Sequence, residues 1–242
     1  HTIVGDSTAG FNALCYALRL LQQGAIDVCL AGGTEELDTI VAGAYAKLKL
    51  LSPNDGGREE IRPFASGEGG TSPKNGFIIG EGACVLTLEK KEAAIKRGAK
   101  IYALISSAGF FAFPQKAASL AALFADEDVL VSSGANGTRF DDFEAALLAC
   151  ALRDAGSVRL FCLKRLIGES FAPGGILQTA AVALAINARV APPLNIAYTL
   201  PLAFLRAVCG KTACNMDIKK AVVVGAGTKG AGYIVILKKP AA

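Results

Sequence analysis

The sequence predicts an α/β protein whose strands lie in layers between helices. Apolar residues make up 52% of its 242 residues, which favours strands buried between helices over a sheet with one face in water. Several of the expected strands are short, continuous apolar runs, as is typical of strands buried on both faces. These runs alternate with helix-like segments, and that alternation indicates α/β layering. The apolar composition also leads us to expect that a partner covers part of the surface.

The first half of the chain begins with a helix at 8–23, which is apolar on nearly every side and ends at Gly24. A helix of that kind is buried, and glycine commonly follows a helix end. The elements expected after it are a strand at 25–33, helical or irregular structure at 36–51, a polar loop at 52–60, a strand that turns through Gly80–Gly82 into a second strand, a helix at 90–97 and a third strand. Because the exposed helix at 90–97 marks a natural boundary, we predict two domains, 1–98 and 99–242.

The second half is expected to contain a helix at 115–125, a strand at 129–133, a helix at 141–152, a strand at 158–163, a helix at 173–187 and two closing strands. Between the closing strands, Gly225, Gly227 and Gly230 form a G-x-G-x-x-G pattern. A dinucleotide site needs a helix to begin at such a pattern, so that its N-terminus faces the pyrophosphate. The strand-like run YIVIL follows instead. The pattern therefore predicts a hairpin, and we expect no cofactor.

The composition excludes several classes of chemistry. Histidine occurs once, at His1. An imidazole inside the fold therefore has to come from another chain, which removes Ser-His-Asp hydrolases, Cys-His nucleophiles and His-ligated metals. We expect no metal site. The net charge of +4 is too small to indicate a nucleic-acid partner. No apolar run is long enough to span a membrane, because the longest, ILQTAAVALAI, is short and contains Gln178 and Thr179.

The seven cysteines form no C-x-x-C pair, and most of them lie in apolar runs. This pattern indicates reduced core residues of a cytoplasmic protein. The N-terminus shows no basic segment followed by an apolar stretch, so secretion is not indicated. The basic segment at 90–100 is interpreted as a solvated helix face, with a docking strip for an acidic partner as the alternative.

Two residues are candidates for chemistry on local grounds. Ser7 follows Gly-Asp and precedes a helix, as a nucleophile at a sharp turn would. The G-x-S-x-G elbow is incomplete because Ala9 stands at its last position, so the alternative is that Asp6 or Ser7 caps the helix by accepting a backbone N–H. Lys164 ends a strand and is expected to be solvated, unless a carboxylate such as Glu144 or Glu169 meets it inside the fold.

Taken in order, several segments resemble the β-ketoacyl synthase family of the thiolase fold. They are STAGFNALCYALRLLQQGAIDVCLAGGTEE, which resembles the family's nucleophile helix and next strand; RPF with NGFIIGEGACVLTLEKKEAAIKRGAKIYALI; VSSGANGT, which resembles the loop of the first catalytic histidine; CLKRLIGESFAPGG, which resembles the segment of the catalytic lysine and second histidine; and GAGTKGAGYIVIL, which resembles the closing turn. The resemblance implies a thiolase-like layered αβαβα fold that lacks the usual first part of the N-terminal half.

The resemblance also implies which positions have lost the family's chemistry. Ser7 stands where the family has its acyl-accepting cysteine, Asn136 stands for the first histidine, and Glu169 for the second. Lys164 is the retained member of the catalytic set. Glu144 matches a family carboxylate that pairs with this lysine, so we expect a Lys164–Glu144 bridge.

The substrate pocket of the family is lined by the closing turn. Ala226 replaces the phenylalanine that gates the acyl pocket, between Gly225 and Gly227. Condensation is expected to fail, because a serine hydroxyl is much harder to ionise than a thiol and no base is present to activate it. The family's two imidazoles support decarboxylation of a malonyl unit; Asn136 still has a hydrogen-bond donor, whereas Glu169 would repel a carboxylate.

The resemblance therefore implies a non-condensing β-ketoacyl-synthase-like subunit, similar to chain-length factors. It would pair with an active ketosynthase subunit in polyketide or fatty-acid-like biosynthesis, shape the acyl pocket and help to dock acyl carrier protein. One alternative is an acyltransferase or hydrolase that uses Ser7 as the acyl acceptor. Another is a structural fragment that completes a split synthase.

Overall fold

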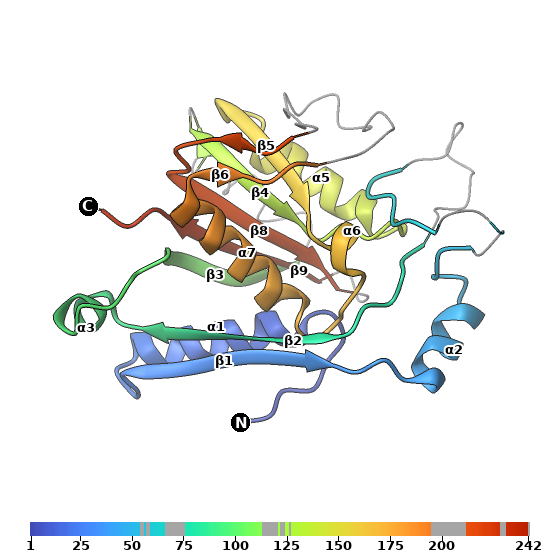
Figure 1. Ribbon diagram of the computed structural model, residues 1–242, viewed down its shortest axis with the longest axis horizontal. Helices are drawn as coiled ribbons and strands as arrows, with labels where there is room; N and C mark the ends of the chain where they lie inside the picture. The colour runs from blue at the N-terminus through green and yellow to red at the C-terminus, as the bar shows by residue number, and fades with distance from the viewer. Residues whose placement is uncertain are drawn as a thin grey trace.

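The computed structural model describes residues 1–53, 56, 59–65, 76–112, 121, 124–125, 127–194, 212–227 and 231–241 (Figure 1). Its elements are α1 (Ala9–Gln22), β1 (Val28–Glu35), α2 (Thr39–Lys47), β2 (Gly82–Glu89), α3 (Lys91–Lys96), β3 (Leu104–Ala112), β4 (Asp128–Ser133), α5 (Asp141–Ala151), β5 (Ser157–Cys162), α6 (Lys164–Ile167), α7 (Gly174–Ala188), β6 (Val190–Ala191), β7 (Cys214–Asn215), β8 (Lys220–Ala226) and β9 (Ala231–Lys238).

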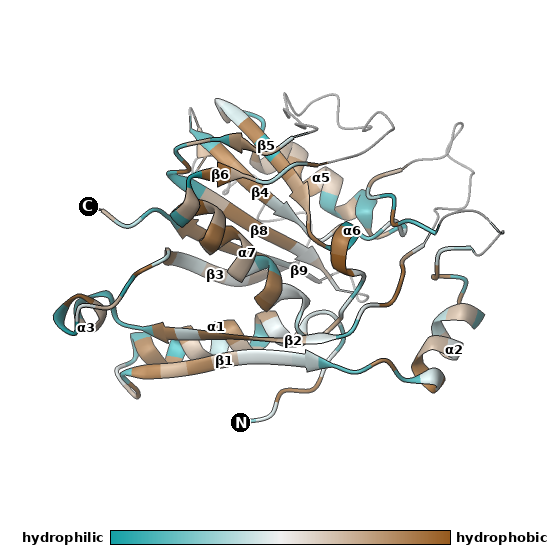
Figure 2. Cartoon of the chain, in the orientation of Figure 1, coloured by the Kyte–Doolittle hydropathy of each residue, from teal (hydrophilic) through white to brown (hydrophobic). Residues whose placement is uncertain are grey.

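A five-stranded mixed sheet forms the centre of the fold, in the order β3-β9-β8-β4-β5. β4 runs parallel to β5 and β8, while β9 pairs antiparallel with β8 and β3. Side chains of β4 and β8 are buried on both faces, and Figure 2 shows β8 as hydrophobic along most of its length. The continuous apolar runs in the sequence are explained by this double burial. The antiparallel pairing of β8 with β9 confirms the hairpin predicted from the glycine pattern, whose third glycine, Gly230, lies outside the described residues.

The second sheet has two antiparallel strands, β1 and β2, paired from Val28 opposite Glu89 to Glu35 opposite Gly82. One face of this sheet packs inward, where Cys84 and Leu86 join the core around α1 and α7. The other face exposes Val28, Leu30 and Val85. Within the described residues, β1 pairs with β2 alone, so its other edge carries no partner strand.

Helices α1 and α7 lie between the two sheets, and α5 covers the opposite face of the five-stranded sheet (Figure 1). Glycine allows α1 and α7 to approach closely. A Cβ at Gly10 would lie 2.4 Å from the carbonyl oxygen of Ala172, and one at Gly175 would lie 2.4 Å from the Phe11 ring. This packing sets the loop before α1 beside the loop before α7.

Most of the predicted elements are confirmed, but some details of burial are wrong. Helix α1 is not buried all round: Cys15 and Leu18 are half-buried and Tyr16 is exposed. The strand expected before Gly80 consists of two isolated bridges, Leu51 with Phe77 and Ile79 with Glu169. These residues align with distant segments and not with a neighbouring strand.

Several predictions concern parts of the chain that are described only in part. Most of the expected helix at 115–125 lies outside the described residues. The six described cysteines are free thiols; Cys162 is fully buried and half-buried Cys84 and Cys214 pack against the core, whereas Cys150 is exposed, so the expectation of core cysteines holds for only some of them. No helix among the described residues is long and apolar enough to cross a membrane. The two sheets lie on either side of the proposed boundary at residue 98, which stays a prediction.

Candidate functional site

The candidate site lies where the parallel strands of the central sheet end. β4, β8 and β5 finish at the same edge of the sheet, since they run in one direction. Asn136 follows β4, Lys164 follows β5, and Ala226 is the last residue of β8. The loop that carries Ser7 reaches this edge from the start of α1. Carboxyl ends of parallel strands are common places for ligand sites, because they gather side chains from several loops.

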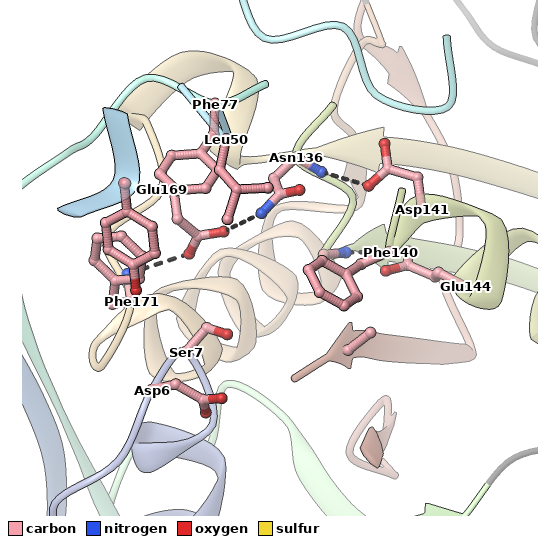
Figure 3. A pocket seen from close by; sticks show the side chains of 13 residues that line it. Asp6, Ser7, Leu50, Phe77, Asn136, Phe140, Asp141, Glu144, Glu169 and Phe171 are labelled. Carbon is pink, nitrogen blue, oxygen red and sulfur yellow. Dashed lines mark hydrogen bonds between the residues drawn. The ribbon is translucent and has the colours of Figure 1, made fainter. Parts of the chain in front are cut away.

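The larger of the two cavities described at this edge spans about 480 Å³, a volume that includes open solvent (Figure 3). The described residues that line it are Asp6, Ser7, Tyr45, Leu50, Phe77, Gly134, Asn136, Phe140, Asp141, Glu144, Glu169, Phe171 and Ala226. Five of the eight predicted site residues are therefore brought together here: Ser7, Asn136, Glu144, Glu169 and Ala226.

The smaller cavity adjoins the first and is a narrow crevice that spans about 210 Å³ including open solvent. It is lined by Ser7, Phe11, Lys164, Gly174, Gly175, Gln178, Gly225, Ala226 and Tyr233. Ser7 and Ala226 line both cavities, so they form the boundary between them. Lys164 lines only the smaller one. Gly227 is buried next to β8 but is not among the described lining residues of either cavity.

Glu169 connects the predicted catalytic positions to one another. Its Oε2 accepts hydrogen bonds from Nζ of Lys164 at 2.6 Å and from Nδ2 of Asn136 at 2.7 Å. Its Oε1 accepts the backbone N–H of Phe171 at 3.2 Å. The Thr138 hydroxyl donates to Oδ1 of Asn136 at 2.7 Å, which fixes the amide with its nitrogen toward Glu169. The three positions thus form one hydrogen-bonded network, and Figure 3 shows its bonds from Glu169 to Asn136 and Phe171.

The backbone around Glu169 is held by the segment at 76–80. The N–H of Glu169 donates to the carbonyl oxygen of Ile78 at 2.8 Å, and the N–H of Gly80 donates to the carbonyl oxygen of Glu169 at 3.0 Å. A Cβ at Gly80 would lie 2.1 Å from the carbonyl oxygen of Ile167, so this close approach requires glycine. Short α6 then ends at Gly168, whose φ of 82° is accessible to glycine and turns Glu169 back toward Lys164.

The predicted Lys164–Glu144 bridge is wrong, because the ammonium of Lys164 pairs with Glu169. Glu144 instead accepts hydrogen bonds from the Ser133 hydroxyl and the N–H of Gly134. Burial raises the pKa of the Glu144 carboxyl to about 8, and the bond from Ser133 offsets only part of that effect. Burial would lower the pKa of Lys164, but the Glu169 carboxylate outweighs it and holds the pKa above its usual value. Lys164 is therefore a buried cation.

Asp141 was not singled out by the sequence analysis, although it organises the loop after β4. Its carboxylate accepts the backbone N–H groups of Phe64 at 2.8 Å, Asn136 at 2.9 Å and Gly137 at 2.9 Å. The signal in the sequence is a pair of aspartates at the predicted helix start, but the long-range contact to Phe64 cannot be read from it. Asp141 is 2% exposed, so it is a structural carboxylate at the cavity wall.

Ser7 lies in the loop before α1 and is not the helix cap. The N-terminal flanking residue of α1 is Thr8, and no side chain caps that end. Asp6 accepts the N–H of Thr8 at 3.0 Å, but it lies two residues before that flanking position and bonds no N–H inside the helix, so the predicted cap by Asp6 or Ser7 is wrong. No histidine lies near Ser7, because His1 contacts Tyr16 on the outer side of α1. Ser7 thus lacks the imidazole that serine nucleophiles use.

Three aromatic rings at the cavity wall were also missed. Tyr45 of α2 stacks on Phe171 with ring centroids 5.0 Å apart, and Phe77 meets both rings edge-on at 5.3 and 5.7 Å. Burial, together with the nearby charges of Glu169, Asp6 and others, raises the pKa of Tyr45. The three rings come from distant parts of the chain, so no periodic pattern in the sequence marks them. They make one wall of the cavity apolar.

The fold and this site place the chain among thiolase-like α/β proteins. Residues 1–94 match the family model described as "Beta-ketoacyl synthase, N-terminal domain". The ketoacyl synthase alpha subunit of the tetracenomycin polyketide synthase, from Streptomyces glaucescens, is 30% identical over 77% of this chain and 47% of that protein. The chain spans about three fifths of the length of the curated relatives that it matches end to end.

Solved structures share the fold over nearly the whole chain. One is AntDE:AntF, a type II acyl carrier protein in complex with its ketosynthase bound to the hexaketide; its TM-score is 0.81 at 22% identity, over 98% of this chain and 62% of that one. The ishigamide ketosynthase/chain length factor has a TM-score of 0.75 at 22% identity, over 96% of this chain and 59% of that one. The chain is therefore a thiolase-fold relative of the β-ketoacyl synthases, as the sequence predicted.

Proposed function

We propose that this chain is a non-condensing, ketosynthase-like subunit that pairs with an active ketosynthase and shapes its acyl pocket, as a chain-length factor does. The observation that carries the proposal is the network centred on Glu169. Its carboxylate accepts hydrogen bonds from both Lys164 and Asn136, so the two groups that would otherwise face a substrate are engaged with Glu169. A site whose polar groups are paired internally is suited to keeping its shape and poorly suited to proton transfer.

The state of Ser7 supports the same proposal. A serine hydroxyl becomes a nucleophile when an adjacent base accepts its proton. Among the carboxyl groups at this site, Glu169 is instead bonded to an ammonium and an amide, so its oxygens are already engaged by two donors. Asp141 is likewise occupied by three backbone N–H groups.

A partner chain is supported by the relatives and by the surface. The matched structures include a ketosynthase with its acyl carrier protein and a ketosynthase/chain length factor. In this chain the outer face of the β1–β2 sheet exposes Val28, Leu30 and Val85. Apolar groups gathered on one face commonly mark a protein interface. We propose a ketosynthase as the partner and acyl carrier protein as the carrier of the acyl substrate.

The decisive experiment is reconstitution with an active ketosynthase from the same source. The two chains are co-expressed, co-purified and supplied with acylated and malonylated acyl carrier protein. We expect this chain alone to form no condensation product, and the complex to form a product whose length distribution differs from that of the ketosynthase alone. Condensation by this chain alone, or a product distribution that does not depend on it, would refute the proposal.

The alternative, in which Ser7 accepts an acyl group, is separated by intact-protein mass spectrometry. The chain is incubated with an acyl thioester and its mass is compared with that of Ser7→Ala treated identically. We expect no adduct on either protein. A covalent adduct that is absent from Ser7→Ala would establish the serine acyltransferase or hydrolase in place of the non-condensing subunit.

A further inference from the structure

Glu144 is a buried carboxyl group at the wall of the larger cavity, and the proposed function does not use it (Figure 3). It comes from the first turn of α5 and is 2% exposed. Within the part of the chain that the structure describes it forms no ion pair, since the ammonium of Lys164 binds Glu169. A buried carboxyl group without a cation partner is more stable with its proton than without it. The surroundings of Glu144 thus favour a neutral carboxylic acid.

Both hydrogen bonds that Glu144 accepts go to the same oxygen. The hydroxyl of Ser133 and the backbone N–H of Gly134, the latter at 3.1 Å, donate to Oε1. Oγ of Ser133 itself accepts the backbone N–H of Ala135 at 3.0 Å, which leaves the Ser133 proton for Glu144. Oε1 is therefore the acceptor of the carboxylic acid, and the proton lies on Oε2.

Oε2 is left available for a ligand. Among the described residues, none forms a hydrogen bond with this oxygen. A Cβ at Gly134 would lie 3.3 Å from Oε2, so glycine at this position leaves the oxygen without a side chain over it. Gly134 and Glu144 both line the larger cavity. Glu144 thus offers the cavity an O–H donor, and a ligand has to supply an acceptor to use it.

Three titratable groups face Glu144: Asp141 on the same helix, Lys164 at the start of α6 and Cys162 at the end of β5. Asp141 opposes ionisation of Glu144 and Lys164 favours it, but burial is the largest influence and raises the pKa of Glu144 to about 8. Burial also raises the pKa of Cys162 to about 12, so its thiol is uncharged at neutral pH. The O–H donor is therefore present at pH 7 and is lost as the pH rises through 8.

We propose that Glu144 donates a hydrogen bond from Oε2 to a keto oxygen of an acyl chain bound in the larger cavity. The inference rests on the proposed function, because it takes the cavity for an acyl site. It goes further by assigning the residue that distinguishes a chain with a keto group from a fully reduced chain. A buried donor favours the ligand that supplies an acceptor, since the reduced chain leaves that donor unpaired. Leu50, Phe77 and Phe140 line the same cavity and suit the hydrocarbon part of the chain.

Four thioesters of N-acetylcysteamine test the proposal on the unmodified full chain. They are hexanoyl, 3-oxohexanoyl, 4-oxohexanoyl and 5-oxohexanoyl, which have equal length and differ only in the keto group. Affinities are measured by isothermal titration calorimetry at pH 6.5 and pH 9. At pH 6.5 we expect at least one keto ligand to bind about fivefold more tightly than hexanoyl, as one added hydrogen bond allows. At pH 9 this preference should be about threefold smaller, because most of the Glu144 carboxyl is then ionised.

Substitutions at position 144 assign the preference to its residue. In Glu144→Gln the amide oxygen can still accept the bonds from Ser133 and Gly134, which places the NH2 group, a donor that does not titrate, at the position of Oε2. We expect this variant to keep the preference at both pH values. Glu144→Met removes the donor and should bind all four ligands equally. The control Glu92→Gln, at an exposed position of α3, should keep both the preference and its pH dependence.

The other outcomes overturn the proposal. Equal binding of all four ligands at pH 6.5 shows that no donor recognises the keto group, and failure of all four shows that the cavity takes no acyl chain. A preference that does not change with pH, or that declines equally in Glu144→Gln, belongs to another group. The pH series needs only the unmodified chain, so it holds even where a variant fails to fold. It is also independent of the reconstitution assay, which can fail while the preference is observed, or succeed without it.

Discussion

The ammonium of Lys164 lies 2.6 Å from Oε2 of Glu169, and the two side chains are only 6% and 2% exposed. They are five residues apart in sequence, across the short α6 and the turn at Gly168. A buried ion pair contributes little net stability relative to apolar residues of the same size, because desolvation opposes attraction. Removing one partner is different, since it leaves an unpaired charge in the interior.

Lys164→Met is therefore expected to lower the free energy of unfolding by about 3 kcal/mol or more, because Glu169 then stays buried without its counter-ion. Urea unfolding followed by circular dichroism measures the change. The double variant Lys164→Met/Glu169→Gln removes both charges and should recover at least half of the loss. Arg153→Met, which breaks the exposed pair with Asp154, is the control and should change stability by less than about 0.5 kcal/mol. A single-variant loss as small as that of the control would contradict the prediction.

A pH dependence of stability is expected from Glu144, whose pKa burial raises to about 8. At a pH between the ordinary pKa of a glutamate, about 4.5, and 8, the Glu144 carboxyl has released its proton in the unfolded chain but retains it in the folded chain. The contribution of Glu144 to stability is thus complete below about pH 4.5 and is lost as the pH rises to 8, by up to about 1.4 kcal/mol per pH unit.

Urea unfolding at intervals from pH 5 to 8 measures this slope. Glu144→Gln should flatten the part of the profile that declines with pH, because the amide does not titrate and its oxygen can still accept the bonds from Ser133 and Gly134. Glu36→Gln, at an exposed position, should keep the wild-type slope. Parallel profiles for wild type and Glu144→Gln would show that the carboxyl is ionised in the folded state at neutral pH.

The close approach of α1 to the loop before α7 predicts opposite effects for two identical substitutions. Gly10→Ala places a Cβ 2.4 Å from the carbonyl oxygen of Ala172 and should destabilise the protein by about 2 kcal/mol or more through overpacking. Gly43→Ala, in the exposed helix α2, meets no atom within 4 Å and should stabilise the helix by about 0.5–1 kcal/mol. Relative to the wild type, the melting temperature should fall for Gly10→Ala and rise for Gly43→Ala. A shift in the same direction for both variants would contradict the close packing of α1 against the loop before α7.

Tyr45 is expected to hold α2 against the body of the protein. No residue of α2 is fully buried, whereas the Tyr45 ring stacks on Phe171 and meets Phe77. Tyr45→Ala should lower the free energy of local opening by about 1–2 kcal/mol, since two aromatic contacts are lost. Hydrogen exchange monitored by mass spectrometry should then show that α2 exchanges faster in Tyr45→Ala than in the wild type, and that this increase is larger in α2 than in other elements. Ile40→Ala, on the exposed side of the same helix, serves as the control, and equal protection in both variants would be evidence against this anchoring role.

The fold could largely be predicted because its signals are local. The apolar runs of β4, β5 and β8 and the helices between them follow from burial on both faces. The positions of Ser7, Asn136 and Ala226 at one edge follow from the resemblance, which transfers a backbone arrangement. What could be predicted is thus mainly where the backbone places each residue.

The contacts within the site could not be predicted, because they depend on side-chain direction and on distant segments. Lys164 had two carboxylates within reach, and the choice of Glu169 depends on the turn at Gly168 and on the bridge to Ile79. The aromatic wall joins residues from three separate regions of the chain. The bond from Phe64 to Asp141 spans 77 residues. No periodicity or short motif in the sequence predicts such long-range contacts.

The exposed edge of β1 has a practical consequence for handling this protein. Among the residues that the structure describes, no strand pairs with the outer edge of the eight-residue β1, and Leu30 and Val28 are exposed beside it, so this edge is a template onto which another copy can add a strand. Expressed without a partner, the chain should therefore precipitate progressively as its concentration rises. A lysine at position 30, as in Leu30→Lys, would place a charge on that face and keep the protein dispersed. The same property makes aggregation under matched conditions a simple first screen for the partner, because a chain that covers the edge will suppress it.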